Sequence, residues 1–162
     1  MSTQVHTARR IDALLAEYAE SHANPTNKMI HWFAVPAIAW SLLAILWYLP
    51  TPESFERVSY LNWATILCAL AVIYYLTLSI PLALGMLAFS IVALWIVWYV
   101  EMNVSLPLFY VGIAVFVFAW LFQFAGHFIE GHKPSFFKDL QFLLIGPAWL
   151  MHFLFRRLGI PY

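Results

Sequence analysis

Residues 60–100 read YLNWATILCALAVIYYLTLSIPLALGMLAFSIVALWIVWYV and contain no aspartate, glutamate, lysine or arginine. One membrane-spanning helix needs about 20 apolar residues, so an uncharged run of twice that length predicts two helices. The credible break is Ser79-Ile80-Pro81, because proline disrupts a helix that reaches it from the N-terminal side. We therefore predict a tight helical hairpin with spans over about 60–78 and 81–100.

The composition of the whole chain agrees with this run. Of its 162 residues, 64% are hydrophobic and 10% are charged, against about 45–50% and about 25% in soluble domains. Lipid must therefore solvate most of the surface, and we predict an all-α, polytopic helical membrane protein. A formal net charge of zero argues against a nucleic-acid partner. Cys68 is the only cysteine, which excludes a disulfide within one chain. The polar residues 1–23 are not expected to be a secretory signal peptide.

The remaining segments complete a single integral-membrane domain, residues 1–162. Residues 7–22 predict an amphipathic helix, and Asn24-Pro25 ends it. Two further spans are expected, over about 29–49 and 106–126. The last apolar segment, 140–155, is short and carries Gly146-Pro147, so we predict a re-entrant segment or a short fifth membrane helix. The prediction is thus four transmembrane helices, an N-terminal amphipathic helix and this C-terminal segment.

Basic residues predict the orientation of these spans. Four spans return the chain to its starting side, which places the following cations together: Arg9, Arg10, Lys28, Lys133 and Lys138. Membrane proteins keep such positive charge in the cytoplasm. We therefore expect both termini to be cytoplasmic.

Residues 123–134, QFAGHFIEGHKP, concentrate polar side chains where the last full span ends. Gln123, His127 and Glu130 are spaced i, i+4 and i+7, so a helix carries them on one face. Gly131 and Pro134 then end the helix. Ionisable side chains at the end of a membrane helix are costly to bury, and they indicate a functional site.

The predicted topology brings five histidines to the same, cytoplasmic face: His22, His31, His127, His132 and His152. Neutral imidazoles with a nearby carboxylate suit a first-row transition metal such as iron or zinc, and a site without thiolates suits non-haem iron. The predicted metal ligands are His22, His31, His127 and His152. Each has a structural alternative, such as a helix cap, an interfacial anchor or a local hydrogen bond.

Other polar residues have predicted roles around this site. Glu130 is the predicted catalytic carboxylate, either as a metal ligand or as an acceptor that fixes a histidine tautomer. Asn27 and Gln123 are candidates to hydrogen-bond a metal ligand or the substrate. Lys28, His132 and Lys133 would surround the site with positive charge, or else contact anionic lipid headgroups.

The residues just described resemble a known family. His22, Asn27-Lys28 and His31, followed by Gln123, His127 and Glu130, are similar to the Mpo-type membrane proteins. That family comprises the yeast endoplasmic-reticulum 2-hydroxy fatty acid dioxygenase and its bacterial relatives, and the resemblance covers essentially the whole chain.

The resemblance implies an Fe(II)-dependent α-oxidation. A 2-hydroxy fatty acid and O₂ would give the fatty acid one carbon shorter, in yeast during breakdown of a sphingolipid base. It also implies that His22, His31 and His127 match the family's histidines, and that the chain is located in a bacterial inner membrane. Two alternatives remain open, a zinc-dependent membrane lipid hydrolase and a non-catalytic carrier or scaffold. The sequence predicts no oligomeric state.

Overall fold

The computed structural model describes residues 9–131 and 136–162, with side chains described for 9–131 and 143–162. All regular structure in these residues is helical, as the composition predicts. Six α-helices and one 3-10 turn follow in order: α1 Arg10–Glu20, α2 Pro25–Tyr48, η1 Glu53–Arg57, α3 Trp63–Leu76, α4 Ile80–Asn103, α5 Leu108–Glu130 and α6 Phe136–Leu158.

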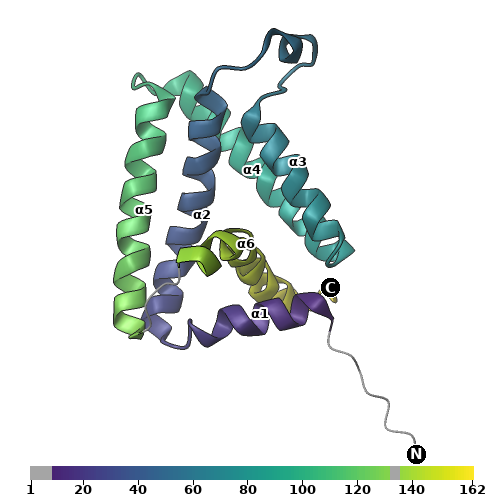
Figure 1. The fold of residues 1–162 in the computed structure, drawn as a ribbon, viewed down its shortest axis with the longest axis vertical. Helices are drawn as coiled ribbons and strands as arrows, with labels where there is room; N and C mark the ends of the chain where they lie inside the picture. Colours follow the sequence, from purple (N-terminus) through teal and green to yellow (C-terminus); the bar gives the residue numbers. More distant parts are fainter. Residues whose placement is uncertain (1–8, 132–135) are drawn as a thin grey trace, which may run out of the picture.

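The helices form two antiparallel pairs and a crosspiece (Figure 1). The α2–α5 pair has the most extensive contact in the fold, and α3 and α4 form the second pair. The crosspiece is α1, which runs along the bottom of Figure 1 and ends near the lower ends of α2 and α5. Helix α6 contacts α1, α2 and α4 and so joins the crosspiece to both pairs.

Three of the described helices are long and apolar enough to cross a membrane, namely α2, α4 and α5, with 23 or 24 residues each. Their outer faces carry exposed aromatic residues such as Phe33 and Phe118, 76% and 64% exposed, as expected for surfaces that lipid covers. Helix α3 has only 14 residues, or about 21 Å at 1.5 Å per residue, against a hydrocarbon core of about 30 Å. The predicted count of four spans is therefore not confirmed.

Helix α6 differs from the expectation for the last apolar segment. It runs from Phe136 to Leu158 with Pro147 inside it, so Gly146-Pro147 does not interrupt the segment. Pro147 has no N–H group and therefore removes one helical hydrogen bond, the one to the carbonyl of Leu143. Here the Tyr75 hydroxyl of α3 donates to the carbonyl of Leu144, next to the carbonyl that Pro147 leaves without its helical donor.

The junction between α1 and α2 forms where Asn24-Pro25 predicts a break. Helix α1 ends at Glu20 and α2 begins at Pro25. The Asn24 side chain accepts hydrogen bonds from the N–H groups of Thr26 and Asn27, at 2.8 and 3.4 Å. An asparagine cap followed by proline at the first helical position is a strong helix start. The junction lets the chain turn between His22 and His31.

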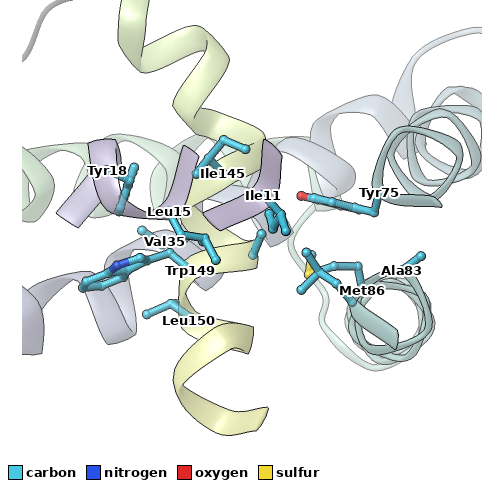
Figure 2. Close-up of a cluster of buried hydrophobic side chains, with 12 residues drawn as sticks. Ile11, Leu15, Tyr18, Val35, Tyr75, Ala83, Met86, Ile145, Trp149 and Leu150 are labelled. Atoms are coloured by element: carbon cyan, nitrogen blue, oxygen red, sulfur yellow. The ribbon is translucent and has the colours of Figure 1, made fainter. Parts of the chain in front are cut away.

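A hydrophobic cluster fixes α1 and α6 against the rest of the bundle (Figure 2). Ile11, Leu15 and Tyr18 of α1 pack with Ile145 and Trp149 of α6, and Val35 of α2 joins them. Tyr75 of α3 and Met86 of α4 close the cluster on its far side. Burying these side chains places the C-terminal end of α1, and with it His22, beside the ends of α2 and α5.

Candidate metal centre

Three histidines from distant parts of the chain meet at one end of the α2–α5 pair. His22 lies in the α1–α2 junction, His31 in the second turn of α2, and His127 in the last turn of α5. They are 2%, 0% and 6% exposed. One ring nitrogen from each lies within 4.8 Å of the others, a spacing that a single metal ion can bridge. The sequence predicts this convergence only through its topology, since 96 residues separate His31 from His127.

Backbone carbonyls set the orientation of two of these imidazoles. Nδ1 of His22 lies 2.6 Å from the carbonyl oxygen of Tyr18, and Nδ1 of His31 lies 2.9 Å from that of Asn27. A carbonyl only accepts, so each Nδ1 carries the proton and donates. The unprotonated Nε2 of each ring is then the atom that can bind a metal.

These two Nε2 atoms face each other at 2.9 Å. With both protons on Nδ1, two lone pairs point at one another, and no hydrogen bond joins them. Such an arrangement is repulsive unless a cation lies between or beside the nitrogens. The chemistry of the donor set therefore fits a bound metal ion.

The rings pack edge to face around this point. Ring centroids are 4.3 Å apart for His22 and His31, 5.2 Å for His22 and His127, and 5.1 Å for His31 and His127. Tyr18 stacks on His22 at 4.1 Å, and Trp149 of α6 lies 5.5 Å from the same ring. These two aromatic side chains form a wall that excludes water from the histidines. Neither side chain has a predicted role at the site. For Tyr18 the available signal was its i, i+4 spacing from His22 within the predicted helix 7–22.

Burial also sets the protonation state of His22. Desolvation lowers the pKa of this imidazole to about 4, and the nearby charge of His127 acts in the same direction. The carbonyl of Tyr18 and the carboxylate of Glu130 oppose this shift without reversing it. His22 is therefore neutral at pH 7, which is the form that ligates a metal.

Gln123, a predicted binding residue, touches the histidines directly. Its amide Nε2 lies 2.7 Å from Nε2 of His31, close enough to donate to that lone pair when no ion holds it. Its Oε1 is buried without a hydrogen-bond partner. An unpartnered buried amide oxygen beside the ring nitrogens is suited to accept a hydrogen bond from a bound molecule.

Glu130 lies at the end of α5 and points toward the start of α2. Its Oε1 accepts from the backbone N–H groups of Ala23 and Asn24, at 2.9 and 3.1 Å. Its Oε2 accepts from the N–H of Asn24 and from Nδ2 of Asn27, both at 3.0 Å. The structure thus shows Glu130 binding backbone and amide donors. It is not part of the group of close ring nitrogens.

Asn27 fills the narrow space between α2 and α5. It is fully buried, and its Nδ2 also lies 3.4 Å from the carbonyl of Ser21. A Cβ on Gly126 would come within 2.3 Å of its Oδ1. A glycine is therefore required at residue 126 for α5 to approach Asn27 this closely.

The other predicted site residues lie elsewhere. His152 of α6 bonds through Nδ1 to the Tyr162 hydroxyl, and the structure does not bring it into the group of three. Burial lowers the pKa of His152, with Arg156 contributing in the same direction. Lys28 is half-buried in the first turn of α2, and His132 and Lys133 lie outside the described residues. The predicted roles of Lys28, His132 and Lys133 around the site therefore stay predictions.

Comparison with known proteins identifies relatives of this chain. Residues 8–158 match the family described as "2-hydroxy-palmitic acid dioxygenase Mpo1-like". The chain is 30% identical over 145 residues to the 2-hydroxy-palmitic acid dioxygenase MPO1 of Saccharomyces cerevisiae, covering 88% of this chain and 78% of the yeast protein. No solved structure matches it. The chain therefore belongs to the 2-hydroxy-palmitic acid dioxygenase Mpo1-like family.

Proposed function

We propose that this protein is a membrane-bound, Fe(II)-dependent dioxygenase that converts 2-hydroxy fatty acids to fatty acids one carbon shorter. Family membership supports the dioxygenase class, and the name of the yeast relative supports a 2-hydroxy fatty acid as substrate. The observation that carries the proposal is the pair of facing Nε2 atoms of His22 and His31, 2.9 Å apart, beside His127.

His22, His31 and His127 would hold the ion. Three imidazoles without a thiolate suit iron or zinc, and family membership favours iron. Bound Fe(II) would supply the redox chemistry by which O₂ cleaves the bond between C1 and C2 of the acid. The reaction balances when the carboxyl carbon leaves as CO₂ and one water forms, so it needs no further reductant.

The surrounding residues would orient the ligands and the substrate. The carbonyls of Tyr18 and Asn27 hold two imidazoles with Nε2 pointing inward. Gln123 would accept a hydrogen bond from the 2-hydroxyl group through its unpartnered Oε1. Tyr18 and Trp149 would keep bulk water from the reacting atoms.

The position of the site suits an amphiphilic substrate. The histidines lie at one end of two candidate membrane spans, α2 and α5. A carboxylate could reach them from the membrane surface while its acyl chain stays among apolar helices or lipid. Lys28 in the first turn of α2 would attract the carboxylate. We propose that this end faces the cytoplasm, because the predicted topology brings most of the basic residues of the chain to this side of the membrane.

Purification in detergent without oxygen, elemental analysis and O₂ uptake with 2-hydroxypalmitate test this function. Palmitate, which lacks the 2-hydroxyl group, is the matched control substrate. We expect one iron per chain, O₂ uptake with the hydroxy acid alone, and loss of both iron and turnover in His127→Ala. Absence of iron together with unchanged turnover in His127→Ala would reject the proposal. Stoichiometric zinc with turnover that needs no O₂ would support the lipid hydrolase instead.

A further inference from the structure

The carboxylate of Glu130 joins two parts of the chain that carry different histidines. Its donors are the N–H groups of Ala23 and Asn24 and the amide of Asn27, more than 100 residues away in sequence. His22 directly precedes these donors, and His127 lies one helical turn before Glu130. Glu130 therefore connects the end of α5 to the junction that carries His22.

The three histidines differ in how firmly the backbone holds them. His31 and His127 lie within α2 and α5, two helices with extensive mutual contact. His22 lies between helices, in the four-residue junction from Ser21 to Asn24. Junctions of this kind open more readily than packed helices. The position of His22 therefore depends on contacts made by the junction itself, in addition to the packing of α1.

Glu130 supplies such contacts at a favourable place. A carboxylate beside the first N–H groups of a helix is stabilised by their unsatisfied donors and by the helix dipole. Both oxygens are engaged, each with two donors. This use of both oxygens distinguishes Glu130 from a metal ligand, which needs a lone pair directed at the ion.

We propose that Glu130 is a positioning residue that acts through His22, by fixing the α1–α2 junction so that His22 completes the metal centre. The proposal rests on the proposed function only in requiring that the three histidines bind a metal ion. It predicts that removing the carboxylate weakens metal binding as much as removing His22, and that the two losses do not add.

Co(II) affinity of the metal-free protein in detergent, followed by the visible spectrum of the bound ion, tests this proposal. The variants are Glu130→Ala, His22→Ala and the double variant, with Glu20→Ala as the control for loss of an exposed carboxylate in the neighbouring turn of α1. We expect Glu130→Ala and His22→Ala each to weaken binding by about 10- to 100-fold. The double variant should match His22→Ala, and Glu20→Ala should match the native chain.

Glu130→Gln provides a second variant, because the glutamine oxygen can still accept from Ala23 and Asn24 while its NH₂ group faces the Asn27 amide. We expect an affinity between those of the native chain and Glu130→Ala. Native affinity in Glu130→Ala would overturn the proposal. A double variant weaker than His22→Ala by the full effect of Glu130→Ala would also overturn it, since Glu130 would then act independently of His22. Failure of the native chain to bind Co(II) would instead refute the proposed metal centre.

Discussion

Replacing Gly126 with alanine should separate α5 from α2 at the metal centre. The added Cβ would lie 2.3 Å from Oδ1 of Asn27, about 1.1 Å short of the 3.4 Å of ordinary contact. Asn27 has little freedom to withdraw, because it is fully buried and its Nδ2 bonds to Glu130 and Ser21. The helices must therefore move apart, or the Asn27 side chain must break those hydrogen bonds.

Overpacking of this kind costs about 1–3 kcal/mol. For a chain of this size, each kcal/mol lowers the melting temperature by about 2–4 °C. Gly126→Ala should therefore melt about 2–12 °C below the native chain in the same detergent. Its metal affinity should also fall, because the carbonyl of Asn27 holds the ligand His31 and its side-chain amide bonds to the Glu130 carboxylate.

Gly112→Ala is the matched control on the same helix pair. Its Cβ would lie 3.1 Å from a side-chain carbon of Ile45 and 3.3 Å from the Cβ of Ala44, so shifts of a few tenths of an ångström accommodate it, far less than Gly126→Ala requires. Thermal unfolding and Co(II) titration of both variants provide the comparison. If Gly126→Ala matches Gly112→Ala in both measurements, the close approach of Asn27 and Gly126 does not constrain the site.

Three further predictions follow from the same geometry. Burial lowers the pKa of His22 to about 4, below its usual value near 6.5, so the metal-free protein should lose stability as the pH falls from 6.5 toward 4. Thermal unfolding across this pH range measures the loss. A pH dependence that stays unchanged in His22→Ala would contradict the prediction. His152→Ala should keep the native metal stoichiometry, since His152 bonds to the Tyr162 hydroxyl. Elemental analysis measures the stoichiometry, and loss of the ion would show that His152 is a ligand. Asn24→Ala should lower the free energy of unfolding by about 0.5–2 kcal/mol through loss of the α2 cap, whereas Asn24→Ser should retain most of it. Equal unfolding temperatures for the two variants would show that the cap does not matter.

Those parts of the fold that depend on local sequence were predictable. The uncharged run of residues 60–100 predicts two helices, and the chain turns between α3 and α4 next to Ser79. Asn24-Pro25 predicts the junction that separates His22 from His31. In each case a proline or a capping side chain acts on its own neighbours, so no knowledge of packing is needed.

Features that depend on packing were not predictable. Pro147 suggests a break, yet α6 continues because neighbouring helices surround it. Composition alone makes residues 60–78 appear long enough to span, but the helix there begins only at Trp63, after the Asn62 cap.

At the site, the sequence predicts the convergence of His22, His31 and His127 but not the separate position of His152. The spacing of Gln123, His127 and Glu130 places all three on one helical face. It does not reveal that Glu130 bonds to Ala23 and Asn24, because those partners lie more than 100 residues away. Long-range partners of this kind require the folded structure.

X-ray absorption spectroscopy of the metal-loaded protein tests the central claim most directly. One ion held by His22, His31 and His127 should show three imidazole ligands and no sulfur ligand, at about 2.0–2.1 Å for a zinc-substituted sample. The imidazole count should fall to two in any of the three single alanine variants that still binds the ion. A count that stays the same in all three variants, or a native protein that binds no ion, would contradict the account.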